Sequence, residues 1–192
     1  MIEFEVTVPR IDMEDARRRL SEGGAVLKRP VFTHKHIVFN MPAERRIKGS
    51  WMRVREEEGR VTMSLKIIDG EKITDQQEYF FIAQNTKDAC NFLELMGAEE
   101  KARQEKRREI WMLGECEVAI DEWPFLEPFL EIEGPDEAAV RGAVESLGYD
   151  YGSCRVCAVD ALYSEKYGLS EDIIDNHTPR IMFDMPNPFL GR

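Results

Sequence analysis

Alternating apolar and polar residues recur through most of the chain and predict β-strands. Between Ile2 and Val8 the apolar side chains occupy every second position, while Glu3 and Glu5 fall on the opposite face. Turn signals at Glu58-Gly59 and Leu113-Gly114 each join two such stretches, as expected for hairpins. The other predicted strands cover 26–39, as one long strand or two short ones, and 51–57, 60–68, 76–82, 102–112, 115–121 and 129–132.

Helices are predicted between several of these strands. Asp12, Asn85 and Asp136 are suitable N-caps, because a short polar side chain can accept a hydrogen bond from the first helical turn. The predicted helices cover 12–20, 85–96 and 135–147, and 157–167 is a candidate for one more. Strands that alternate with helices in this way are typical of an α+β protein.

The regular pattern ends near residue 167, and no Gly/Ser-rich or Pro-rich linker divides the chain before it. We therefore expect one domain, residues 1–167, followed by an extended tail, residues 168–192, packed on the body or on a partner chain. The tail and the apolar outer surfaces would allow a homodimer.

The charge of the chain limits its partners. The 192 residues contain 26 Lys+Arg and 37 Asp+Glu, which gives a formal net charge of −11. This charge opposes sequence-independent binding to nucleic acid or to an anionic membrane, so an anionic ligand needs a local basic site. No apolar run approaches the ~18 residues of a membrane span, and the early acidic residues do not suit a signal peptide, so we expect a cytoplasmic protein.

Charged residues are paired at positions two apart on the predicted strands, where side chains point the same way. A wet face of an antiparallel sheet explains any single pair. The whole set needs a further explanation, because several strands carry two basic or two acidic residues on one face and apolar residues on the other. The pairs are Glu3 with Glu5, Arg53 with Arg55, Lys106 with Arg108, and Glu131 with Glu133, to which Lys66 and Asp121 add single charges.

A sheet that curls into a closed barrel would place these charges in its lumen. Buried like charges repel and lose hydration, so such a lumen is stable only where acids and bases pair or where ions occupy it. A ligand with several negative charges, bound with a divalent metal, meets both needs. Lys and Arg hold phosphate oxygens, and carboxylates hold the metal.

Seven short motifs follow one another between residue 2 and about residue 167. They are Glu3-Phe4-Glu5, Trp51 to Arg55, Thr62 to Lys66, Glu78, Lys106 with Arg108 and Trp111, Ile120-Asp121, and Phe129 to Glu133. In this order they resemble the signatures of the CYTH domain family, which is named for class IV adenylyl cyclase and thiamine triphosphatase and belongs to the triphosphate tunnel metalloenzymes. The corresponding signatures are E-x-E-x-K, L-R-x-R, a strand ending in lysine, a further acid, K-x-R-x-x-Y, L-D and F-x-E-I-E.

The resemblance implies an eight-stranded antiparallel β-barrel, a tunnel with helices packed on the outside, that binds a small-molecule triphosphate. It implies Mg²⁺ or Mn²⁺ as cofactor. The phosphates would be held by Arg53, Arg55, Lys66, Lys106 and Arg108, and the metal by Glu3, Glu5, Glu78, Asp121, Glu131 and Glu133. The residues expected to carry catalysis are Glu3, Glu5, Arg53, Arg55, Lys66, Glu131 and Glu133.

Two positions depart from the family pattern. Thr7 replaces the lysine of the opening signature, which removes a cation from the expected lumen. His36 stands where the family often has an aspartate, which alters the expected entrance.

The favoured function is metal-dependent hydrolysis of a triphosphate, either inorganic tripolyphosphate or an organic triphosphate. One alternative is a class IV adenylyl cyclase, which forms cyclic AMP and pyrophosphate from ATP on the same barrel. A second alternative is a module that binds phosphate or polyphosphate without cleaving it. Nucleic-acid binding is disfavoured by the net charge.

Overall fold

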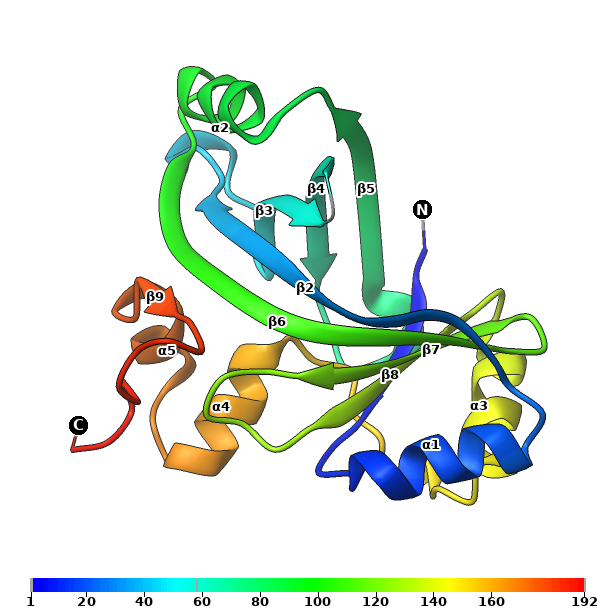
Figure 1. The fold of residues 1–192 in the computed structure, drawn as a ribbon. Helices are drawn as coiled ribbons and strands as arrows, with labels where there is room; N and C mark the ends of the chain where they lie inside the picture. The colour runs from blue at the N-terminus through cyan, green and yellow to red at the C-terminus, as the bar shows by residue number, and fades with distance from the viewer. Residues whose placement is uncertain (1, 58, 192) are drawn as a thin grey trace.

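One curved sheet organises the chain, as Figure 1 shows. The structure is a computed structural model that describes residues 2–57 and 59–191, so Glu58 of the predicted turn lies outside the described residues. The strands are β1 (Phe4–Val8), β2 (Val26–Asn40), β3 (Ser50–Glu57), β4 (Arg60–Ile68), β5 (Gln76–Ala83), β6 (Glu99–Leu113), β7 (Cys116–Glu122), β8 (Phe129–Gly134) and the short β9 (Arg180–Ile181).

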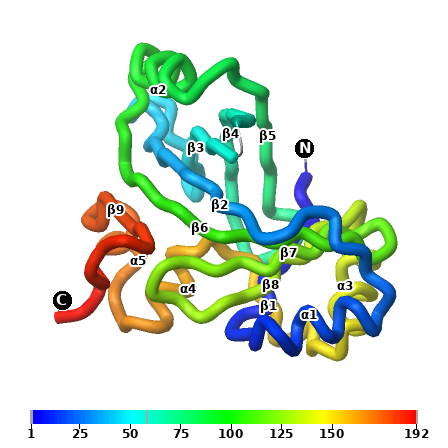
Figure 2. The backbone as a smooth tube through the Cα atoms, viewed as in Figure 1, coloured from blue at the N-terminus to red at the C-terminus, as the bar shows by residue number. Residues whose placement is uncertain are grey.

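The long strands pair in the order β1-β8-β7-β6-β2-β3-β4-β5, and every pair in this path is antiparallel. They curl into a half-barrel, which confirms the predicted α+β class and its eight antiparallel strands. The two ends of the path meet at an isolated bridge between Ile2 and Gln77. The N-terminal segment beside the lower part of β5 is visible in Figure 2. Beyond that bridge β5 continues without β1, and its side chains from Tyr79 to Ile82 are exposed.

Helices cover the outer face of the half-barrel, where the apolar residues of the strands gather. Leu20 and Val140 pack with Val6, Val118 and Ile132 in one core, and α2 closes a second core over β3 and β4. The helices are α1 (Met13–Glu22), α2 (Thr86–Leu95), α3 (Glu137–Ser146), α4 (Val159–Tyr167) and α5 (Glu171–Asn176), with 3-10 turns at Ala43–Arg45, Ile73–Asp75 and Tyr151–Ser153.

The N-caps of the first three helices are those that the sequence predicts. Asp12, Asn85 and Asp136 each accept a hydrogen bond from a backbone N–H in the first turn. In the described part of the chain, no helix combines the length and the apolar character that a membrane crossing requires.

The C-terminal segment differs from the expected extended tail. Gly168 ends α4 in a left-handed conformation with φ of 66°, which glycine adopts without strain. Ser170 then caps α5, and β9 pairs in parallel with β6 at Arg103 and Gln104. This pairing is available because β7 pairs with β6 only from Arg107 onward.

Candidate active site

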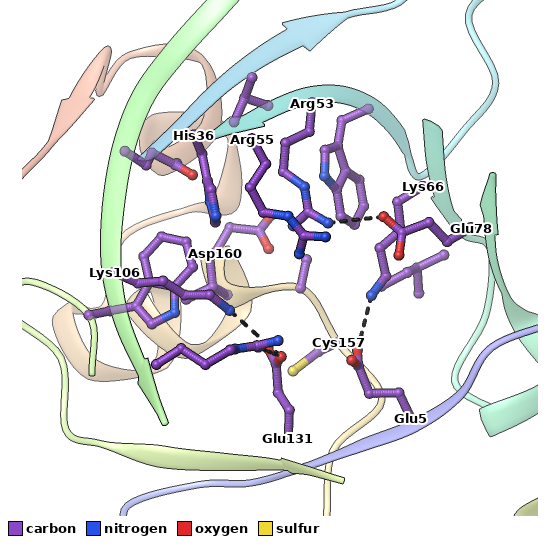
Figure 3. Close-up of a pocket in the computed structure, with 18 of the residues that line it drawn as sticks. Glu5, His36, Arg53, Arg55, Lys66, Glu78, Lys106, Glu131, Cys157 and Asp160 are labelled. Carbon is purple, nitrogen blue, oxygen red and sulfur yellow. Dashed lines mark hydrogen bonds and ion pairs between the residues drawn. The ribbon is translucent and has the colours of Figure 1, made fainter. Parts of the chain in front are cut away.

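The inner face of the half-barrel encloses a cavity of about 370 Å³ (Figure 3). It exists because the polar positions of the alternating strands face inward while helices cover the apolar positions. The site residues nominated from the sequence line it, apart from Asp121, which is fully buried beside it. Those that line it are Glu3, Glu5, Arg53, Arg55, Lys66, Glu78, Lys106, Arg108, Glu131 and Glu133.

Three carboxylates converge on the side of the cavity formed by β1 and β8. Glu3, Glu5 and Glu133 each place an oxygen within 4.8 Å of the other two. Their meeting follows from the register, because Glu5 lies directly opposite Glu133 in the β1–β8 pair. Lys66 reaches across from β4, and its Nζ lies 2.9 Å from Glu3 Oε2 and 3.0 Å from Glu5 Oε1.

The acidic cluster carries more negative charge than Lys66 compensates. Burial and the neighbouring carboxylates of Glu5 and Glu78 raise the pKa of Glu3 to about 8, against the opposing effect of Lys66. Burial, followed by Glu5 and Glu117, raises the pKa of Glu133 to about 7.

A divalent cation with oxygen ligands fits this cluster. Carboxylate oxygens are the ligands that Mg²⁺ and Mn²⁺ prefer, and a positive charge there would stabilise the charged carboxylates that burial and mutual repulsion disfavour. The fit rests on Glu3, Glu5 and Glu133, whose oxygens lie close enough together to share one ion.

Next to this cluster, on β7 and β8, Asp121 and Glu131 are already paired with basic residues. Arg108 makes a bidentate contact with Asp121, at 2.7 Å from Nε to Oδ1 and 2.6 Å from Nη2 to Oδ2, and also donates to Glu131. Lys106 Nζ lies 2.6 Å from Asp121 Oδ2. Burial disfavours the charged form of Glu131, but Arg108 and Lys106 outweigh it and hold the pKa of Glu131 well below its ordinary value.

The β3 arginines form the third part of the cavity wall. Arg53 Nη2 donates to Glu78 Oε1 at 2.9 Å, and Arg53 and Lys66 hold the pKa of Glu78 at about 2 although burial opposes this. Arg55 is less well compensated: its Nε lies 3.4 Å from Thr62 Oγ1 and 3.7 Å from the nearer oxygen of Glu57. Burial and the nearby Arg53 lower the pKa of Arg55 to about 10. An anion placed here would meet positive charge that the protein itself neutralises incompletely.

A row of buried basic groups facing an acidic cluster inside a half-barrel is the arrangement that the sequence motifs predict. The model of the CYTH domain matches residues 1–158. The chain belongs to the CYTH domain family.

Solved structures support the CYTH fold across most of the chain. A Vibrio parahaemolyticus protein named as a candidate adenylate cyclase has a TM-score of 0.71 at 15% identity, covering 85% of this chain and 98% of that one. A conserved hypothetical protein from Pyrococcus furiosus has a TM-score of 0.67 at 17% identity, covering 79% and 94%. A Hippeastrum protein named as a candidate adenylyl cyclase with a dominant triphosphatase activity has a TM-score of 0.58 at 10% identity, covering 88% and 97%. No curated protein matches the chain.

The two departures from the CYTH pattern have different consequences. Thr7 is buried and exchanges backbone hydrogen bonds of 2.8 Å with Arg155, so this position adds no cation to the cavity. His36 is buried on β2 and lines the cavity, where burial and Arg53 hold its pKa well below the ordinary value. The sequence shows that His36 replaces the aspartate of the family pattern, but it does not predict that the His36 ring packs against Trp123.

Other cavity residues were not nominated from the sequence. Glu117 on β7 lies opposite Glu133 on β8 and lines the cavity. The alternation that selected Asp121 also puts Glu117 on the same face, so the signal was present. Asp160 and Tyr163 line the cavity from α4, and no motif in the sequence points to them.

Proposed function

We propose that the chain hydrolyses a triphosphate inside this cavity with the help of a divalent metal. The observation that carries the proposal is the pairing of two opposite deficits within one enclosed space. Glu3, Glu5 and Glu133 carry more negative charge than Lys66 compensates, and Glu57 compensates the charge of Arg55 only in part. A triphosphate bound with Mg²⁺ or Mn²⁺ supplies both.

The basic residues would bind and orient the phosphates. Guanidinium groups match phosphate oxygens with two parallel hydrogen bonds, so Arg53, Arg55 and Arg108 would fix the chain of phosphates along the cavity. Lys106 adds a point charge beside them. Asp121, Glu131 and Glu78 would hold these cations in position through the ion pairs that they make in the structure.

Glu3, Glu5 and Glu133 would hold the metal, with Lys66 steadying the first two carboxylates. When bound, the metal would stabilise negative charge on the phosphates and lower the pKa of a water molecule. Phosphoryl transfer passes through a loose transition state, so positioning and charge neutralisation by these residues account for most of the catalysis. No covalent nucleophile is needed.

The fold alone also suits a cyclase, which is the alternative that the Vibrio protein's name suggests. The dominant triphosphatase activity stated for the Hippeastrum protein is consistent with hydrolysis on this fold. We therefore favour hydrolysis over cyclisation.

The test is product analysis with purified protein. Inorganic tripolyphosphate and ATP are incubated separately with Mg²⁺ or Mn²⁺, with EDTA as the metal-free control. Metal-dependent release of orthophosphate supports the proposal, and Glu133→Gln should abolish it whereas Glu22→Gln, on the exposed face of α1, should not. Formation of cyclic AMP and pyrophosphate, or tight binding without any product, would overturn it.

A further inference from the structure

The cavity has a second region whose chemistry differs from the charged part. It lies between β2, β6, the residues after β7 and the C-terminal segment. Apolar side chains form much of its wall, including Val38, Ile174 and Ile181, together with the ring of Tyr163. The hydroxyl of Tyr163 donates a hydrogen bond to Pro124 O at 2.7 Å, so it is not available to a ligand. Apolar walls with a few polar groups are typical of sites for small organic ligands.

Two polar side chains in this region have nitrogen atoms without a hydrogen-bond partner in the described part of the chain. They are Nε2 of His36 and Nε1 of Trp123. The residues are 3% and 6% exposed, and both line the cavity. Their rings meet edge to face with centroids 5.8 Å apart. Figure 3 shows His36 extending from β2 toward the cavity. Because buried polar atoms in folded proteins are nearly always paired, these two atoms point to a missing ligand.

The charge around this pair selects the kind of ligand. Burial, Arg53 and Lys106 keep His36 neutral, so its imidazole adds no charge of its own. Lys106 Nζ lies 5.6 Å from the centroid of the Trp123 ring, and Asp121 already holds that ammonium group. Because Lys106 lies beside the Trp123 ring, a neutral ligand group suits the His36–Trp123 pair better than a cation, although Asp160 and Asp175 line another part of the cavity wall.

We propose that this region binds the organic part of the substrate, and that this part is an uncharged planar heterocycle such as a nucleobase. Trp123 Nε1 can only donate, so the ligand must present an acceptor to it, and His36 Nε2 can bond to a neighbouring polar atom of the same ring. Lys106 Nζ lies 5.6 Å from the centroid of the Trp123 ring and shares Asp121 with Arg108, so a triphosphate joined to the heterocycle would meet these phosphate-binding residues. The inference rests on the proposed triphosphatase function and names its substrate class.

The C-terminal segment supplies much of this region. Asp160, Tyr163, Ile174 and Ile181 come from residues that follow the CYTH match, which ends at residue 158. The segment is anchored where β9 pairs with Gln104, and where the backbone N–H of Phe183 donates to Glu105 Oε1 at 2.7 Å. The residues that select the substrate would therefore come partly from outside the family domain.

The test measures selectivity rather than activity alone. With Mn²⁺ as metal, kcat/KM is determined for inorganic tripolyphosphate, for the four common ribonucleoside triphosphates and for the cationic thiamine triphosphate. We expect at least one nucleoside triphosphate to exceed both of the others by tenfold or more. His36→Phe and Trp123→Phe keep an aromatic ring and remove the nitrogen atoms, and each should lower the ratio of nucleoside triphosphate to tripolyphosphate by roughly tenfold to a hundredfold.

Trp111→Phe is the matched control, because Trp111 lies outside the cavity and donates to Glu109 at 2.7 Å. It should leave the ratio unchanged. A wild-type preference for tripolyphosphate or thiamine triphosphate, or equal losses on all substrates in the two cavity variants, would overturn the inference.

Failure of the proposed function has a different signature, which is the absence of product from every substrate. In that case the affinities of the same compounds are measured by calorimetry in the presence of Mn²⁺, and they decide whether the heterocycle region exists. Tighter binding of a nucleoside triphosphate than of tripolyphosphate, lost in Trp123→Phe, upholds the heterocycle region, and equal affinities refute it.

Discussion

Two groups of carboxylates face the same cavity and have opposite electrostatic states. Glu131 and Asp121 on the β7–β8 side are clamped by Arg108 and Lys106 at distances of 2.6–2.7 Å to Asp121. Glu3 and Glu133, on the β1–β8 side, crowd together, and their pKa values are raised to about 8 and about 7. The residue types are alike, so the partners make the difference.

This contrast suggests different roles for the two groups of carboxylates. A carboxylate that is already neutralised by a guanidinium group gains little from a metal, whereas one that repels its neighbours gains much. We infer that the acids next to β1 bind the metal and that the acids next to β6 hold the phosphate-binding cations in place.

The largest effect should come from removing one carboxylate of the acidic cluster. Glu133→Gln keeps the size of the side chain and removes its charge, so it should lower kcat by about 10³-fold, equivalent to ~4 kcal/mol of transition-state stabilisation. The fold should survive, because the backbone pairing of Glu133 with Glu5 and Glu117 is unchanged by the substitution and its side chain makes no hydrogen bond or ion pair within the described residues. The measurement is steady-state phosphate release with Mn²⁺, with circular dichroism as the check on folding. Full activity in this variant would contradict the assignment.

Asp121→Asn should instead act mainly on stability. The substitution leaves Arg108 and Lys106 buried beside an uncharged amide, and breaking a buried ion pair in this way costs about 3–5 kcal/mol. Thermal unfolding followed by circular dichroism should show a lower Tm than in Glu133→Gln. An unchanged Tm would show that the buried network does not hold the basic side together.

Removing a phosphate-binding guanidinium should weaken binding more than it slows the chemical step. Arg53→Ala and Arg55→Ala are expected to raise KM for the triphosphate by about tenfold, because each removes a charge-assisted hydrogen bond to phosphate. Arg55→Ala should leave the free protein less disturbed than Arg53→Ala, which also leaves Glu78 without its 2.9 Å contact. Initial-rate kinetics separate the two constants, and a loss confined to kcat would argue against a binding role.

The smallest effect concerns the pH dependence of stability. The pKa of His36 is held well below its ordinary value of 6.5 by burial, followed by the titratable groups near it on β3, β6 and β2. These groups are Arg53, Lys106, His34 and Arg55. The unfolded chain therefore binds a proton at this residue below pH 6.5 when the folded chain does not, and the free energy of unfolding falls as the pH falls.

His36→Phe removes this contribution, so the drop in Tm from pH 7.5 to pH 5.5 should shrink by roughly 2–4 °C, equivalent to about 1 kcal/mol. His34, whose pKa is also lowered by burial and Lys106, remains in the variant, so part of the drop should persist. An identical drop in wild type and variant would show that His36 takes up its proton in the folded chain.

The sequence predicts which residues face the cavity better than it predicts their partners. Alternation with a period of two on β3 and β6 was enough to put Arg53 and Arg55, and Lys106 and Arg108, on the inner face. The pairing of Arg108 with Asp121 depends on the register of the β6–β7 hairpin, in which Leu113 pairs with Cys116, whereas the predicted turn lies one position earlier, at Leu113-Gly114.

The C-terminal segment was the least predictable part of the molecule. Its apolar residues lack a clear helical or strand period, and their burial depends on contacts with Trp123 and Phe129, which are distant in sequence. Consequently the extended tail of the sequence-based interpretation is in the structure a short helix, α5, and a strand, β9, and its contribution to the cavity was missed.

The most direct test of the contrast between the two acidic groups is Mn²⁺ binding by electron paramagnetic resonance in wild type, Glu133→Gln and Glu131→Gln. The account predicts that Glu133→Gln weakens Mn²⁺ binding at least tenfold, while Glu131→Gln stays within about threefold of wild type. Wild-type binding in Glu133→Gln together with lost binding in Glu131→Gln would contradict it.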